Sequence, residues 1–271
     1  MLHVTPHGVP IPALGLGTFR LNGPVAERIV GHALAVGYRH IDTAQMYGNE
    51  TEVGAAIRRS PVPRGEIWLT TKIWPDHFRA AALLRAAEES VRRLGTEPDL
   101  LLLHWPNPDV PLAETVGALN EAKDRGLARH VGVSNFPTAL LREAVAHSAA
   151  PLLVNQVEYH PYLEQSAVLR ELKRQDMALT AYSPIGRGKV FHEPTLQRIG
   201  EAHGKNAVQV TLRWLLQQGV AAIPRSAREA NVEANLAVFD FSLSDDEMAE
   251  TFGLARPDGR MLRPATAPDW D

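Results

Sequence analysis

The run Leu100-Leu101-Leu102-Leu103-His104-Trp105 decides the fold class, because four consecutive leucines end in a histidine. A strand with one exposed face alternates apolar and polar residues, whereas an unbroken apolar run is typical of a strand covered on both faces. Leu152-Leu153-Val154 is a second run of this kind. These runs predict a parallel sheet that is covered by helices.

Working outward from this run, the same unit recurs along the chain: a short apolar or β-branched segment, followed by a longer segment with helical spacing. The residues of 80–94 show the helical pattern well, with Leu83, Leu84, Ala87, Val91 and Leu94 on one side. The predicted strands are 14–18, 39–43, 67–73, 100–104, 130–134, 152–156, 178–182 and 220–224. Further amphipathic helices are expected at 111–125, 138–147, 165–174 and 207–218.

Strands that alternate with helices indicate a parallel sheet with crossover helices, and about 250 residues is the usual length of a (β/α)8 barrel. We therefore expect one α/β domain over residues 1–271, a (β/α)8 TIM barrel. A short N-terminal hairpin is expected at 2–13, with its turn at His7-Gly8. The segment 244–255 predicts an extra C-terminal helix, and the proline-containing tail 256–271 predicts loop.

The composition narrows the function classes. The chain has 271 residues, of which 45% are hydrophobic and 22% are charged, and its formal net charge is −3. This charge argues against a general nucleic-acid binder. Because there is no cysteine, disulfides, thiolate nucleophiles and cysteine-bound zinc are excluded. With no signal peptide and no apolar run near the ~20 residues of a membrane span, we expect a cytoplasmic protein that is not a membrane protein.

Polar side chains gather where the predicted strands end, which is the catalytic face of a barrel. Asp42 and Tyr47 follow the second strand, Lys72 ends the third and His104 ends the fourth. Each residue alone has a structural explanation: a helix cap for the aspartate, a solvated lysine, a loop tyrosine or a buried histidine. Their convergence on one face favours a catalytic site.

The four residue types suit the reduction of a carbonyl group. Hydride addition leaves negative charge on the carbonyl oxygen, so a proton donor is needed, and Tyr47 can serve as that general acid. Lys72 would lower the pKa of Tyr47, and Asp42 would keep Lys72 charged and in place. The N–H of His104 would orient the carbonyl oxygen.

These residues lie within motifs that resemble the aldo-keto reductase family, across essentially the whole chain. The branch resembled most is that of short bacterial members that reduce 2,5-diketo-D-gluconate and methylglyoxal, on the evidence of residues 13–21 and the ending Ala267-Pro268-Asp269-Trp270-Asp271. The motifs, in family order, are Gly37-Tyr38-Arg39-His40-Ile41-Asp42-Thr43-Ala44 with Tyr47-Gly48-Asn49-Glu50, Leu69-Thr70-Thr71-Lys72-Ile73-Trp74, Leu103-His104-Trp105-Pro106, Gly132-Val133-Ser134-Asn135-Phe136, Asn155-Gln156-Val157-Glu158 and Ala181-Tyr182-Ser183-Pro184.

The resemblance implies a nicotinamide cofactor, NADPH, with NADH left open. The implied cofactor-binding residues are Asp42; Gly17, Thr18 and Phe19 near the reactive end; Ser134, Asn135 and Gln156 at the carboxamide; Tyr182 stacked on the nicotinamide; Ser183, Pro184, Ile185 and Gly186 at the pyrophosphate; Arg225, Ser226 and Arg228 at the 2′-phosphate; and Asn235 at the adenine. Arg225 replaces a family lysine but can still bind a phosphate. Asn231 and Ala234 replace a family arginine and glutamate, so we expect a looser hold on the adenine.

The expected substrate is a small carbonyl compound, such as methylglyoxal or 2,5-diketo-D-gluconate. The expected pocket residues are Phe19, Tyr47, Trp74, His104 and Trp105, with Met46 nearby. No metal is expected, because none of the eleven histidines forms an H-x-H or H-E-x-x-H pattern. The family implies a monomer.

Two other classes of protein compete with this interpretation. A Rossmann dehydrogenase needs G-x-G-x-x-G, and Gly15-Leu16-Gly17 has no third glycine in place. A nicotinamide-binding regulatory barrel without physiological turnover stays open, although all four catalytic residue types are present.

Overall fold

Eight parallel strands form the centre of the protein in the computed structural model, which describes residues 2–264 and 267–271. The strands pair in sequence order from the first to the last. They are β3 Leu16–Gly17, β4 His40–Asp42, β5 Trp68–Ile73, β6 Leu100–Leu103, β7 His130–Ser134, β8 Leu152–Glu158, β9 Ala178–Tyr182 and β10 Ala221–Ala222. All eight strands lie at or within two residues of the predicted ranges, so the predicted parallel sheet is confirmed.

The sheet closes on itself to form a barrel. Leu14, just before β3, forms a parallel bridge with Ala222 of β10, and the Gly15 N–H donates to the Ala222 carbonyl at 2.9 Å. Glycine is required at position 17, because a Cβ there would lie 2.8 Å from the Ile223 carbonyl oxygen. This closure pairs the first strand of the sheet with the last. Because all eight strands are parallel, their carboxyl ends lie at one face of the barrel.

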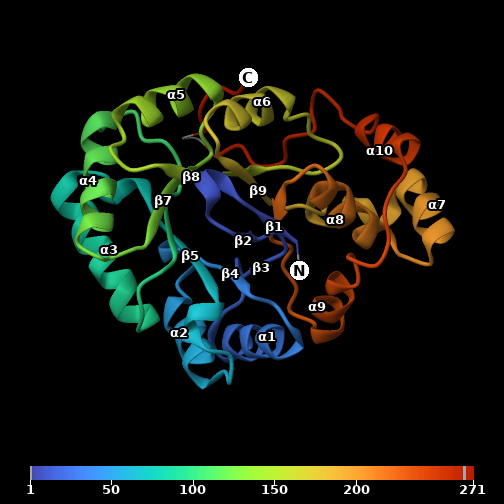
Figure 1. Ribbon diagram of the computed structural model, residues 1–271, viewed down its shortest axis with the longest axis horizontal. Helices are drawn as coiled ribbons and strands as arrows, with labels where there is room; N and C mark the ends of the chain where they lie inside the picture. Colours follow the sequence, from blue (N-terminus) through green and yellow to red (C-terminus); the bar gives the residue numbers. More distant parts are fainter. Residues whose placement is uncertain (1, 265–266) are drawn as a thin grey trace.

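Helices surround the barrel as an outer ring (Figure 1). Those that follow the strands are α1 Gly23–Val36, α2 Glu50–Arg59, α3 Ala80–Leu94, α4 Leu112–Asp124, α5 Thr138–His147, α6 Ser166–Arg174, α8 Ala207–Gln217 and α9 Glu229–Leu236. The predictions for α3 and α5 match residue for residue. Among the described residues, no helix has both the length and the apolar character needed to cross a membrane.

The elements outside the repeat are largely as predicted. The N-terminal hairpin pairs β1 His3–Val4 with β2 Ile11–Pro12, and α10 Asp245–Phe252 is the expected C-terminal helix. A second extra helix, α7 Pro194–His203, was not predicted. It packs beside α10, where His203 Nε2 lies 2.8 Å from Glu247 Oε1.

Candidate active site

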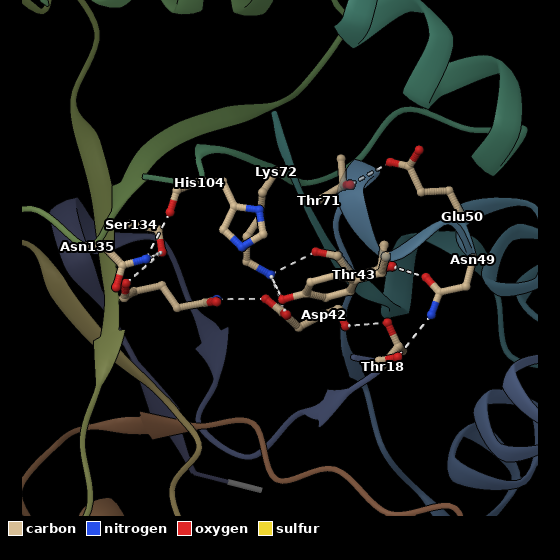
Figure 2. Close-up of polar contacts among 12 residues, drawn as sticks. Thr18, Asp42, Thr43, Asn49, Glu50, Thr71, Lys72, His104, Ser134 and Asn135 are labelled. Atoms are coloured by element: carbon tan, nitrogen blue, oxygen red, sulfur yellow. Dashed lines mark hydrogen bonds and ion pairs between the residues drawn. The ribbon is translucent and has the colours of Figure 1, made fainter. Parts of the chain in front are cut away.

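A buried ion pair lies at the carboxyl ends of β4 and β5. Lys72 is fully buried and Asp42 is 1% exposed, and Lys72 Nζ donates to Asp42 Oδ1 at 2.6 Å. Nζ also donates to the Thr43 carbonyl at 2.8 Å, as Figure 2 shows. Burial lowers the pKa of Lys72 from 10.5, and the negative charge of Asp42 opposes this shift. The pair therefore places a held ammonium group inside the barrel mouth.

Tyr47 lies above this pair, in the short 3-10 helix Gln45–Tyr47 that follows β4. Its hydroxyl is 3.4 Å from Lys72 Nζ, and its ring is partly exposed. Burial of the hydroxyl, with the charge of Asp42 as a second cause, raises the pKa of Tyr47 well above 10. The net shift is opposite to the lowered pKa expected for Tyr47, because desolvation and the charge of Asp42 exceed any lowering by Lys72. Tyr47 thus holds a proton at neutral pH.

His104 directly follows β6 Leu100–Leu103 and completes the group. Its ring packs edge-on against Tyr47 and Trp74, with centroids 5.7 and 5.2 Å apart. Its Nδ1 is buried and has no hydrogen-bond partner in the part of the chain that the structure describes. Burial, with the charge of Lys72 adding to it, holds the pKa of His104 well below its ordinary 6.5. The ring is therefore neutral at pH 7 and offers one N–H donor.

These directions predict the pH dependence of carbonyl reduction. His104 stays neutral through the ordinary imidazole range, so kcat/KM shows no inflection near pH 6.5. Lys72 carries its charge only below a pKa lowered from 10.5, so kcat/KM falls as alkaline pH rises through that value. A pH profile of the wild type and His104→Gln checks this. An acid-side inflection near 6.5 that vanishes in His104→Gln would contradict it.

A chain of hydrogen bonds joins this group to the ends of β7, β8 and β9. Gln156 Nε2 donates to Asp42 Oδ2 at 2.7 Å, and the Ser134 hydroxyl donates to the Gln156 carbonyl at 2.7 Å. Asn135 donates to the His104 carbonyl at 2.9 Å and accepts from the Tyr182 hydroxyl at 2.8 Å. The residues expected at the carboxamide are therefore joined to Asp42 and His104 by hydrogen bonds.

Two residues hold the loops of this site and were given no role from the sequence. Asn49 donates to the carbonyls of Thr18 and Leu21 at 2.9 and 2.8 Å, and accepts from the Thr43 hydroxyl at 2.6 Å. Glu50 is buried and accepts from the Thr71 hydroxyl at 2.6 Å (Figure 2). Both residues belong to the motif Tyr47-Gly48-Asn49-Glu50. Two adjacent polar residues that closely follow Tyr47 were the sequence signal that could have identified them.

The residues expected at the cofactor phosphate lie on the same rim. Arg225 is exposed and donates to the carbonyls of Phe19 and Arg20 at 3.0 and 3.2 Å. The Ser226 hydroxyl accepts from the Arg228 N–H at 3.0 Å, just before α9 begins. Asn235 lies buried on α9. The structure thus brings Arg225 next to Phe19.

The expected cofactor loop after β9 has an unusual backbone. Ser183 and Gly186 both have positive φ, 48° and 52°, and a Cβ at Gly186 would lie 3.2 Å from atoms of Tyr162 and Met261. Pro184 and Ile185 lie between them. A tight turn of this kind exposes backbone groups to a ligand at the strand end.

The expected pocket residues differ in how open they are. Phe19 is 39% exposed, and its ring centroid is 5.1 Å from that of Tyr47. Trp74 is partly exposed and contacts His104, and Met46 is exposed. Trp105 is only 7% exposed, so little of its side chain is open to a substrate.

A hollow of about 570 Å³ lies elsewhere, between α1 and α2, and includes none of the catalytic group. Among the described residues, no group of three or more histidine, aspartate or glutamate side chains is placed to hold a metal ion.

The structure thus brings a tyrosine, a buried lysine–aspartate pair and a neutral histidine together at the carboxyl ends of the strands of a (β/α)8 barrel. The model of the aldo/keto reductase family matches residues 13–255. The chain belongs to this family.

Individual relatives agree with this assignment. Methylglyoxal reductase DkgB of Yersinia pestis is 39% identical over 265 residues, which cover 96% of this chain and 99% of that protein. An aldo-keto reductase of Mycobacterium sp. (strain KMS) is 42% identical over 260 residues, with 95% and 93% covered. A crystal structure reported as that of a 2,5-diketo-D-gluconic acid reductase B has a TM-score of 0.98 and 51% identity, and covers 100% of this chain and 98% of that chain.

Proposed function

We propose that the protein reduces a small aldehyde or ketone to the alcohol with NADPH, and that Tyr47 is the general acid. The observation that carries this proposal is the buried Lys72–Asp42 pair beneath the Tyr47 hydroxyl, 3.4 Å from Nζ. A buried lysine costs free energy unless its charge is used or compensated. Here the Lys72 ammonium lies next to the Tyr47 hydroxyl, which is the group that would release the proton.

The residues at the barrel mouth fit a nicotinamide cofactor. Ser134, Asn135 and Gln156 offer amide and hydroxyl groups for a carboxamide, and Tyr182 lies within hydrogen-bond distance of Asn135. Arg225 and Arg228 offer two positive charges at the start of α9, where a phosphate is favoured. When bound, the cofactor supplies the hydride.

The chain's own residues supply the remaining chemistry. The neutral His104 donates its N–H to the substrate carbonyl and orients it. Tyr47 transfers its proton to the oxygen as negative charge develops there, and the Lys72 ammonium stabilises the resulting phenolate. Asp42, held by Gln156 and Lys72, fixes the ammonium below the hydroxyl. Phe19 and Trp74 keep water from the carbonyl.

The proposed substrates are small dicarbonyls, methylglyoxal or 2,5-diketo-D-gluconate. The names of the relatives and the aromatic walls support this class. We also propose a single-domain, monomeric cytoplasmic enzyme, which rests on the family resemblance.

The test is the loss of reduced-nicotinamide absorbance with each dicarbonyl, run in parallel with NADPH and NADH. We expect turnover with both dicarbonyls and a higher kcat/KM with NADPH. Tight NADPH binding without turnover of any carbonyl would point instead to the regulatory alternative.

Replacing Arg225 by alanine is expected to weaken NADPH binding about 10- to 100-fold, the usual size of a lost charged hydrogen bond, and to leave NADH binding nearly unchanged. Only NADPH carries the 2′-phosphate. Dissociation constants from fluorescence titration check this. Arg225→Lys, which restores a charge, is the matched control and should keep the preference. Equal losses for both cofactors would show that Arg225 acts only by holding Phe19 and Arg20.

A further inference from the structure

The C-terminal tail is fixed at two points on the catalytic face. Glu158, the fully buried last residue of β8, accepts from the N–H groups of Met261 and Leu262 at 2.8 and 3.0 Å. The last residue, Asp271, accepts from the N–H and hydroxyl of Thr138 at 2.9 and 2.6 Å, at the start of α5. Figure 1 shows the chain end beside α5. Met261 and Leu262 are thereby held at the end of β8, and Asp271 is held at the start of α5.

Two donors without partners meet on this tail. The Arg260 guanidinium stacks on the Trp270 indole, with Cζ 3.6 Å from the ring centroid. Arg260 Nη1 and Trp270 Nε1 are both buried, and neither has a hydrogen-bond partner among the described residues. Arg260 also forms no ion pair with any described carboxylate. Unpaired buried donors cost free energy, and a guanidinium costs more than a neutral group.

Within the described part of the tail, neither donor has an acceptor. The two oxygens of Glu158 are taken by Met261, Leu262 and His160 Nε2, the last at 3.1 Å. The carboxylates of Glu158 and Asp271 act on Arg260, so the charge around it is balanced. What distinguishes the site is the pair of free N–H groups on Arg260 and Trp270.

The site borders the catalytic group. The charge of Arg260 acts on the Tyr182 hydroxyl, and that hydroxyl bonds to Asn135, which in turn bonds to the His104 carbonyl. Met261 lies against Gly186 in the turn after β9. Arg260 thus lies near Tyr182, and the next residue, Met261, lies against the proposed cofactor loop.

We propose that Arg260 and Trp270 form an oxyanion-binding site at the edge of the carbonyl site. The inference rests on the proposed function and adds a charged group to the ligand that it recognises. The planar guanidinium binds an oxyanion through two parallel N–H bonds, and the indole N–H supplies a third. The oxyanion is a carboxylate on the carbonyl substrate or a phosphate of the cofactor.

The test compares Arg260→Ala, Arg260→Lys and Trp270→Phe with the wild type, and Arg263→Ala is the matched control from the same tail. The probes are 3-carboxybenzaldehyde, the uncharged benzaldehyde, and NADPH. For a substrate carboxylate, Arg260→Ala raises KM for 3-carboxybenzaldehyde about 10- to 100-fold relative to benzaldehyde. Trp270→Phe, which keeps the stack but lacks the N–H, raises it less, and Arg263→Ala leaves the ratio unchanged.

For a cofactor phosphate, the same variants instead weaken NADPH binding and keep the ratio of the two KM values. Calorimetric titration of benzoate into the protein and into its NADPH complex measures the site without turnover. If the wild type reduces neither these aldehydes nor methylglyoxal, the proposed function fails, while benzoate binding still tests Arg260. If Arg260→Ala changes neither the KM ratio, nor the NADPH affinity, nor benzoate binding, the site is a structural stack and the inference is overturned.

Discussion

Replacing Tyr47 by phenylalanine is expected to lower kcat for carbonyl reduction by about 10²- to 10⁴-fold, the range that a positioned general acid contributes. The phenol is the nearest proton donor to Lys72, and its raised pKa keeps it protonated through the neutral range. Phenylalanine keeps the ring contacts with Phe19 and His104. The measurement is steady-state kcat with methylglyoxal and NADPH.

The dissociation constant of NADPH is the control in this variant. It should stay within about twofold, because the lost hydroxyl bonds to Lys72 and to no proposed cofactor residue. Wild-type turnover in Tyr47→Phe would remove Tyr47 from the mechanism. Loss of both turnover and NADPH binding would mean that the hydroxyl is needed to bind the cofactor, so the lost turnover would not identify a proton donor.

Replacing Lys72 by methionine is expected to lower the free energy of unfolding by about 3–5 kcal/mol, as when one partner of a buried ion pair is removed. Asp42 is 1% exposed, and its carboxylate would keep its charge with the hydrogen bond from Gln156 Nε2 in place of the lysine. Reduction should also be lost, because no ammonium remains below the Tyr47 hydroxyl. Denaturant unfolding and kcat measure the two effects separately.

The double variant Asp42→Asn, Lys72→Met separates stability from chemistry. Removing both charges should recover most of the lost stability, since no buried charge is left unpaired. Reduction should stay lost. A double variant that is as unstable as Lys72→Met would show that the cost comes from packing around the side chain and not from the charge of Asp42.

The sequence predicts the barrel and the meeting of the catalytic residues for one physical reason. Buried parallel strands leave unbroken apolar runs, and their carboxyl ends share a face, so Asp42, Lys72 and His104 must lie together once the strands are placed. The register confirms this, with Asp42 of β4 beside Thr70 of β5, and Lys72 beside Leu102 of β6.

Other features depend on contacts that no local pattern encodes. The pKa of Tyr47 depends on how deeply the hydroxyl is buried, which the residue type does not reveal. Glu158 accepts hydrogen bonds from Met261 and Leu262, which follow it by 103 and 104 positions in the sequence. Helix α7 did carry signals, with Pro194 in its first turn, the left-handed Gly204 after its end, and Leu196 and Ile199 on its buried face, so the sequence contained enough to predict it.

The most direct test of the central claim follows the hydride and the proton donor in one experiment. The protein is incubated with methylglyoxal and NADPH deuterated at the transferable position, beside Tyr47→Phe at equal NADPH saturation. The wild type is expected to form an alcohol that carries deuterium at the former carbonyl carbon. Tyr47→Phe is expected to form this alcohol at a rate at least about 10²-fold lower. Saturating NADPH binding with no deuterated alcohol from the wild type would contradict the central claim.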